Sequence, residues 1–178
     1  MSEIRIASRY ASSLLGLAEE QGKLDAVQND MQQFKSACEG SRELVNMLKS
    51  PIVTPALKRQ VLDKTFGSFQ DLSKLFLQTV VRKGREAYLP MIASEYLAQY
   101  NEKKNIAKAV VTTANPINAD MVAKIKKELE VKTGKTIEIE TQVDASIIGG
   151  LVVRINDSLF DASIANSLKK IKKELVLN

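Results

Sequence analysis

The sequence offers few side chains that could perform covalent or acid–base chemistry. It contains no histidine and one cysteine, Cys38. Without histidine there is no Ser-His-Asp or Cys-His pair and no histidine-ligated metal. One cysteine cannot form an internal disulfide or hold a zinc ion alone. Cys38 lies on the apolar face of a predicted helix, so we interpret it as a small core or groove residue and not as a nucleophile.

Two further patterns could bind a phosphate or a metal ion. Gly149-Gly150 precedes a predicted strand, which is neither the dinucleotide fingerprint nor the P-loop context, so we interpret it as a bulge or a close backbone approach. Asp144, Asp157 and Asp161 lack the spacing of an EF-hand loop, and each lies at a predicted turn or cap. We therefore predict no catalytic, cofactor-binding or metal-binding residues.

The net charge of +5 could indicate a nucleic-acid partner. Residues 1–105 carry 15 basic and 12 acidic side chains, and residues 106–178 carry 11 and 9, so the surplus is spread along the chain. A nucleic-acid-binding protein needs a basic stripe, and single strands need aromatic platforms, but aromatic residues are only 5% of the chain. We expect no nucleic-acid partner.

Apolar periodicity predicts helices throughout the first hundred residues. The first helix has Ile6, Tyr10, Leu14 and Leu17 at helical spacing, and the small residues Ala7 and Ala11 beside them would let another helix approach closely. The fifth segment, from Asp71 to Lys83, is apolar over most of its circumference, which is typical of a central helix. These two helices would leave a groove for an amphipathic partner helix if they lie side by side, although plain intramolecular packing explains the same pattern.

A polar run from Asn101 to Asn105 separates the two predicted domains. Residues 1–105 form a six-helix bundle, and residues 106–178 form a small β-α-β-β-α domain, so the fold class is α+β. The predicted segments of the second domain are strands 107–114, 137–143 and 151–155, a short partner strand near Leu159 and Phe160, and helices 118–132 and 164–175.

Several short strings occur in order along the chain: Ala7-Ser8-Arg9-Tyr10-Ala11, Ser50-Pro51 with Lys58, Lys83-Gly84-Arg85, Val111-Thr112-Thr113-Ala114 with Pro116, Val143-Asp144 through Ile148-Gly149-Gly150-Leu151, and Asp161-Ala162-Ser163-Ile164 with Leu168. Together they resemble the delta subunit of bacterial F-type ATP synthases, which is similar to the mitochondrial oligomycin-sensitivity-conferring protein. The glycine pair with the following Asp-x-Ser string is the most specific portion. Ala162 departs from the pattern, where Gly or another small residue is expected.

The resemblance implies a non-catalytic stator subunit without cofactors. It would link the catalytic head to the peripheral stalk, so that proton-driven rotation is coupled to ATP synthesis. Residues 1–105 would bind the N-terminal helix of an α subunit, and residues 106–178 would bind the b subunits. The chain would be present as one copy in a hetero-oligomeric complex, peripheral on the cytoplasmic face of the bacterial plasma membrane.

The resemblance also implies positions for the two contacts. The residues expected to bind the α-subunit helix lie on the first and fifth helices: Tyr10, Ala11, Leu14, Leu75, Thr79 and Val80. The residues expected to bind the b subunits lie on the last helix: Ile164, Leu168, Ile171 and Leu175.

Two other classes of protein remain open. A cytosolic adaptor or a nucleic-acid-associated two-domain protein would have the same composition, and the latter would bind nucleic acid with a steep salt dependence. A small enzyme would need a pocket with convergent polar groups, which the sequence does not indicate. No window approaches the roughly 18 apolar residues of a membrane span, and the first residues resemble neither a secretory signal nor a transit peptide, so we expect a soluble bacterial chain.

Overall fold

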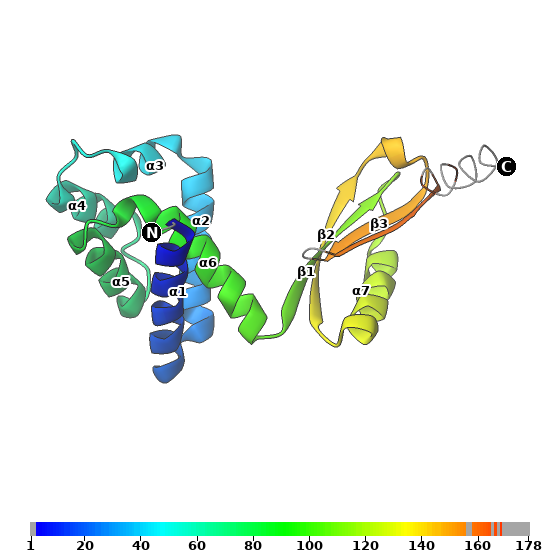
Figure 1. The fold of residues 1–178 in the computed structure, drawn as a ribbon, viewed down its shortest axis with the longest axis horizontal. Helices are drawn as coiled ribbons and strands as arrows, with labels where there is room; N and C mark the ends of the chain where they lie inside the picture. Colours follow the sequence, from blue (N-terminus) through cyan, green and yellow to red (C-terminus); the bar gives the residue numbers. More distant parts are fainter. Residues whose placement is uncertain (1–2, 156–157, 165, 167, 169–178) are drawn as a thin grey trace. The chain divides into compact units, whose positions relative to one another are not determined.

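The chain folds into two compact units, residues 1–103 and residues 104–178. The structure is a computed structural model that describes residues 3–155, 158–164, 166 and 168 (Figure 1). The first unit is helical, and the described residues of the second combine a sheet with one long helix. We call them the helical unit and the sheet unit.

The helical unit contains six α-helices in its described residues, together with one turn of 3-10 helix. They are α1 (Glu3–Glu20), α2 (Leu24–Gly40), α3 (Arg42–Lys49), α4 (Pro55–Thr65), α5 (Asp71–Arg82), η1 (Glu86–Tyr88) and α6 (Leu89–Lys103). Local sequence fixes two of the starts. The hydroxyl of Ser41 accepts a hydrogen bond from the amide of Leu44, and that of Thr54 accepts one from the amide of Leu57. Pro55 then occupies the first helical turn, where its missing N–H has no partner to lose.

The start of α5 depends on a residue that is distant in sequence. Gln70 makes no side-chain capping bond of its own. Instead, the buried carboxylate of Asp30 on α2 accepts a hydrogen bond from the Gln70 amide at 2.9 Å and another from the Ser73 hydroxyl at 2.6 Å. These bonds satisfy donors at the helix N-terminus and attach α5 to α2.

The core of the helical unit lies between α1, α2 and α6, because α6 packs against both α1 and α2 (Figure 1). Leu14, Phe34 and Tyr96 from these three helices are fully buried. Alanines on α1 let α6 approach closely, and Gln99 on α6 donates hydrogen bonds to both the backbone oxygen and the hydroxyl of Ser8.

The break between the units is shorter than the sequence predicts. Helix α6 continues through Asn101, Glu102 and Lys103, so the polar run forms the last turn of a helix and the sheet unit begins at Lys104. An ion pair between Lys103 and Glu19 holds this turn against the end of α1. The polar side chains lie on the solvent side of the helix and therefore give no signal of where it ends.

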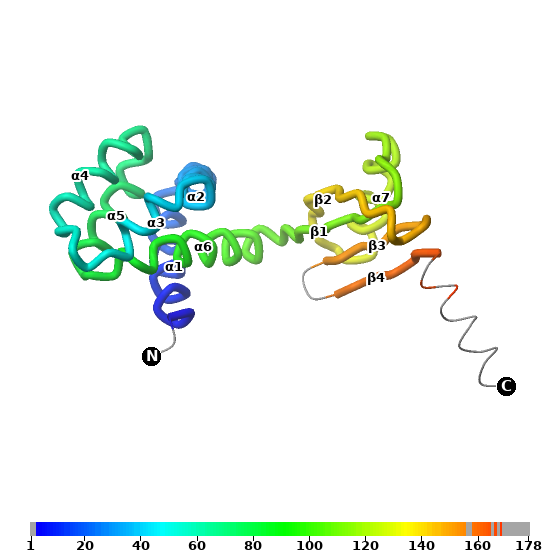
Figure 2. Tube along the Cα trace, turned by 90° about the horizontal axis from the view of Figure 1, so that it is seen from above, coloured from blue at the N-terminus to red at the C-terminus, as the bar shows by residue number. Residues whose placement is uncertain are grey.

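The described part of the sheet unit contains four strands and one long helix. The elements are β1 (Ile106–Thr113), α7 (Ala119–Thr133), β2 (Thr136–Val143), the 3-10 turn η2 (Ala145–Ile147), β3 (Gly150–Ile155) and β4 (Ser158–Ser163). The strand order is β2-β1-β3-β4, with β1 parallel to β2 and both other pairings antiparallel (Figure 2).

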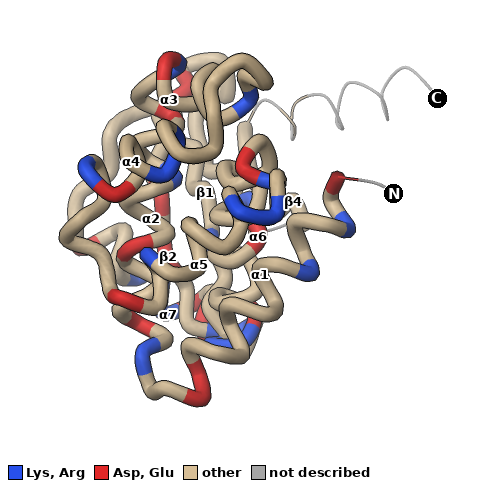
Figure 3. The backbone as a smooth tube through the Cα atoms, turned by 90° about the vertical axis from the view of Figure 1, so that its left-hand side faces the viewer, with Lys and Arg blue, Asp and Glu red and all other residues tan. Residues whose placement is uncertain are grey.

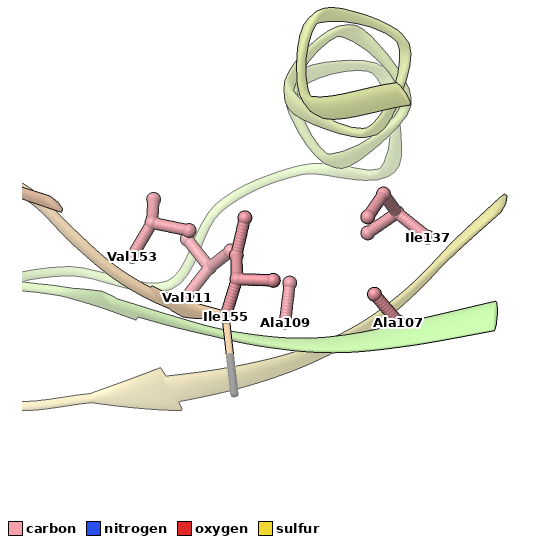
Figure 4. Close-up of a cluster of buried hydrophobic side chains, with 6 residues drawn as sticks. All are labelled: Ala107, Ala109, Val111, Ile137, Val153 and Ile155. Carbon is pink, nitrogen blue, oxygen red and sulfur yellow. The ribbon is translucent and has the colours of Figure 1, made fainter. Parts of the chain in front are cut away.

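Alternation along the strands places one set of apolar side chains under α7. Figure 4 shows them on the face of the sheet that the helix covers: Ala107, Ala109, Val111, Ile137, Val153 and Ile155. Ile125 and Leu129 of α7 pack onto this cluster. Because successive strand residues point to opposite faces, the register Val111↔Val153 keeps all of these side chains on one side.

The predicted partner strand near Leu159 and Phe160 is present and longer than expected. It is β4, which reaches Ser163, so Asp161 belongs to a strand and the short form β-α-β-β-α counts one strand too few. The described residues directly after β4, Ile164, Asn166 and Leu168, are helical. The hydroxyl of Ser163 accepts a hydrogen bond from the Asn166 amide at 3.1 Å, which is the arrangement of a helix cap. Most of the predicted helix 164–175 lies outside the described residues.

The glycine pair is explained by close backbone approach, as predicted. Gly150 has φ of 79°, and a Cβ atom there would lie 2.3 Å from the carbonyl oxygen of Ala162 on the neighbouring strand. A Cβ atom on Gly149 would lie 2.8 Å from Cδ1 of Ile164. The pair therefore shapes the place where the start of β3 lies beside the end of β4, which we call the β3–β4 corner.

Candidate partner-binding surface

The described side chains that could take part in nucleophilic or metal chemistry, Cys38, Asp144 and Asp161, have structural contacts instead. Cys38 is buried, and burial together with the nearby Glu39 carboxylate raises the pKa of its thiol from 9.0 to about 11, so it remains a protonated core residue. Hydrogen bonds from the hydroxyl and then from the amide of Ser146 lower the pKa of Asp144, and Asp161 accepts a hydrogen bond from the Ser163 amide. Asp157 lies outside the described residues, among which no group of acidic, cysteine or histidine side chains could hold a metal ion.

Helix α1 carries two apolar stripes that are displaced by one residue. The first stripe is fully buried and consists of Ala7, Ala11, Leu14 and Ala18. The second follows the same spacing one position earlier and is only partly covered; its apolar members are Ile6, Tyr10 and Leu17, and the polar Ser13 lies between the last two. One residue is about 100° of rotation on a helix, so the second stripe faces the flank of the unit.

Helix α5 has a similar division. Leu77, Val80 and Val81 are buried in the core, whereas Leu75 is 62% exposed and Thr79 is half-buried. The helix is therefore not central on all sides, which corrects the prediction from its composition. Its outer apolar residues face away from the core on the flank of the unit.

One contact between rings joins the two partly exposed stripes. The centroids of Tyr10 on α1 and Phe76 on α5 are 6.4 Å apart, and the rings meet edge to face. Both side chains are half-buried, so each keeps part of its area at the surface. We call the surface formed by Ile6, Tyr10, Leu17, Leu75, Phe76 and Thr79 the α1–α5 surface.

The structure separates the six residues predicted to bind the α-subunit helix into two groups. Ala11, Leu14 and Val80 are fully buried inside the helical unit, which corrects the prediction that they lie on a partner-binding surface. Helical periodicity identifies the apolar face of a helix but does not tell whether that face lies in the core or at the surface. Tyr10, Leu75 and Thr79 do lie at the surface. Sequence reasoning missed Ile6, Leu17 and Phe76 as members of this surface, and the displaced spacing on the first helix was the available signal.

A basic cleft of about 540 Å³ opens beside the α1–α5 surface and shares Ile6 and Tyr10 with it. Its other lining residues are Arg5, Arg9, Ser13, Arg85 and Tyr88. Arg5 and Arg9 are one helical turn apart on α1, where Figure 3 shows basic residues in blue. The cleft therefore combines positive charge with an apolar margin.

Backbone geometry at the end of α5 brings Arg85 to the cleft. The amide of Gly84 donates to the carbonyl of Val81, and the amide of Arg85 donates to the carbonyl of Val80. Gly84 has φ of 65°, so these bonds form a Schellman motif that ends the helix and reverses the chain. Lys83-Gly84-Arg85 is thus a turn that places one arginine.

A buried ion pair fixes the next turn, η1, which carries Tyr88. The ammonium group of Lys58 on α4 donates to Glu86 Oε1 at 2.8 Å and to the carbonyl oxygen of Leu48 at 2.9 Å. Lys58 is almost fully buried, and these two partners replace the water that its ammonium group would otherwise bind. The pair links α3, α4 and η1, and so supports the wall of the cleft.

The residues predicted to bind the b subunits are only partly described. Ile164 and Leu168 are about half exposed, whereas Ile171 and Leu175 lie outside the described residues. Ile164 lies against Gly149, and its amide donates to the carbonyl of Gly149 at 3.0 Å. Three other apolar side chains of the sheet unit are exposed, and sequence reasoning did not select them: Ile148, Leu159 and Phe160.

Comparisons with known proteins agree over nearly the whole chain. The model of the "ATP synthase delta (OSCP) subunit" family matches residues 6–175. The chain is 38% identical to the ATP synthase subunit delta of Cytophaga hutchinsonii, covering 98% of this chain and 96% of that protein. It is 33% identical to the subunit delta of Christiangramia forsetii, covering 98% and 95%. A chain of the Toxoplasma gondii mitochondrial ATP synthase hexamer has the same fold, with a TM-score of 0.73 at 24% identity over 96% of this chain and 97% of that one.

Proposed function

Because the chain belongs to the ATP synthase delta (OSCP) subunit family, we propose that its two units make two different contacts within the synthase. Membership makes the chain a non-catalytic stator subunit of a membrane-associated complex. Among the described residues, no helix has the length and hydropathy required to span a bilayer.

The helical unit is proposed to bind the N-terminal helix of an α subunit at the catalytic head. The observation that carries this proposal is the α1–α5 surface, where Tyr10, Leu75 and Thr79 expose apolar area on two adjacent helices. An amphipathic helix that places its apolar face on such a surface would bury these side chains without rearranging the core.

The test is a titration of the full chain with a peptide of the α-subunit N-terminus. Leu75→Asp places a charge in the proposed contact, and we expect affinity to fall at least 10-fold while the fold is retained, because Leu75 is already exposed. Ile52→Asp is the matched control, since Ile52 is 89% exposed in the loop before α4 and lies outside the surface. Equal affinity of the two variants would contradict the proposal.

The sheet unit is proposed to bind the b subunits of the peripheral stalk. Support comes from exposed apolar side chains at the β3–β4 corner and beyond it, including Ile148, Ile164 and Leu168. Ile171 and Leu175 remain predictions for the same contact. Truncation before Lys169 should abolish capture of b subunits in a pull-down, and retention of the b subunits by the truncated chain would refute the assignment of Ile171 and Leu175 to this contact.

Together the two contacts would prevent the catalytic head from turning with the rotor. The chain would be present as one copy in each complex, on the cytoplasmic face of the membrane. No nucleic-acid contact is part of this proposal. The rival adaptor function would be favoured only if the purified chain failed to recover the α, β and b subunits and instead bound nucleic acid with a steep salt dependence.

A further inference from the structure

The basic cleft holds three arginines whose charges are not balanced locally. Arg5, Arg9 and Arg85 are exposed at its rim, and none of them forms an ion pair with a carboxylate in the part of the chain that the structure describes. The nearby Glu86 is already paired with Lys58. Three guanidinium groups around one cleft repel one another and attract an anion.

The spacing of these groups matches carboxylates on a helix. Arg5 and Arg9 are four residues apart, which is a rise of about 6 Å along α1. Acidic residues at positions i and i+4 of a helix lying along α1 have the same separation. A guanidinium group binds a carboxylate through two parallel hydrogen bonds, whereas an ammonium group does not provide this geometry.

The cleft is also continuous with the α1–α5 surface, because both include Ile6 and Tyr10. A helix whose apolar face covers Leu75 and Tyr10 would therefore bring its neighbouring polar face to the arginines.

We propose that Arg5, Arg9 and Arg85 bind acidic side chains of the helix that docks on the α1–α5 surface. The cleft thus selects a helix with carboxylates beside its apolar stripe and fixes its register along α1. This inference rests on the proposed docking of a helix at that surface.

The experiment compares two peptides on the full chain by calorimetry. One is the peptide of the α-subunit N-terminus, and the other is the same peptide with every Asp replaced by Asn and every Glu by Gln. We expect the neutral peptide to bind the unmodified chain about 10-fold more weakly. Arg5→Gln combined with Arg9→Gln should weaken binding of the acidic peptide by a similar factor and should abolish the difference between the two peptides.

Arg59→Gln is the control variant, because Arg59 is exposed on α4 and does not line the cleft. It should bind both peptides as the unmodified chain does. Equal binding of the two peptides by the unmodified chain would overturn the inference while leaving the docking proposal intact. So would an equal loss for both peptides in the double variant, because the arginines would then act through their apolar stems. If neither peptide binds the unmodified chain, the docking proposal fails and the inference fails with it.

Discussion

The rings of Tyr10 and Phe76 meet edge to face with their planes at 70°, and this contact joins α1 to α5. The main packing partner of α1 is α6, and the buried stripe of α1 lies about 100° around the helix from the stripe that carries Tyr10. The aromatic pair therefore holds together the two helices whose outer stripes form the proposed partner-binding surface. It couples the stability of the helical unit to the shape of that surface.

Tyr10→Ala and Phe76→Ala should each lower the free energy of unfolding, and the double variant should lose less than the sum. Edge-to-face pairs contribute about 0.5–1.5 kcal/mol beyond area burial, so we expect a coupling energy of that size from urea unfolding of the four proteins. Additive losses would mean that the two rings act independently.

Lys58→Ala should be one of the most destabilising single changes in the helical unit. It leaves the Glu86 carboxylate in a largely buried position without its cation, and breaking a buried pair in this way costs about 3–5 kcal/mol. Lys74→Ala removes an exposed pair with Asp71 and should cost less than about 1 kcal/mol. Chemical denaturation of both variants tests the contrast, which would disappear if water reached Glu86 freely.

Gly150→Ala should destabilise the sheet unit by more than about 3 kcal/mol. The added Cβ would lie 2.3 Å from a backbone oxygen that the β3–β4 pairing holds in place. Gly134→Ala is the matched control, because Gly134 has φ of 65° with open space around it, so only the backbone cost of about 1 kcal/mol applies. Similar losses in both variants, measured by thermal unfolding, would show that the corner adjusts.

The helical unit should lose stability in alkaline solution. Burial raises the pKa of Cys38 from 9.0 to about 11, and burial and the hydrogen bond to Asp25 raise that of Tyr100 from 10.0 to about 12. The unfolded chain releases these protons first, so their contribution is complete below pH 9 and is lost as the pH rises to about 12. Urea unfolding at pH 8, 10 and 11 should show this decline. Cys38→Ala should flatten its first part, and an unchanged slope would contradict the assignment.

The local sequence of this protein was sufficient for most of its elements. Capping residues such as Ser41 and Thr54 predict where helices begin, and strict alternation from Ile137 to Val143 predicts a strand. Both signals are local, because they depend on residues only a few positions apart. The same local information placed Gly149-Gly150 at a close backbone approach. It failed at the ends of elements, where exposed polar residues extend α6 through Lys103 without any local penalty.

What only the tertiary structure decided is which apolar stripe becomes core. On α1, Leu14 and Tyr10 are both apolar and both at helical spacing, yet α6 covers one and leaves the other at the flank. Periodicity identifies the apolar side of a helix, but whether a given residue on that side is buried depends on which neighbouring helix packs against it. The carboxylate of Asp30 and the ammonium of Lys58 likewise reach partners about 40 and 28 residues away, and no local pattern encodes these contacts. The sequence alone therefore determined the family and the elements, whereas the packing of α6 and α5 against α1 determined which residues are left for a partner.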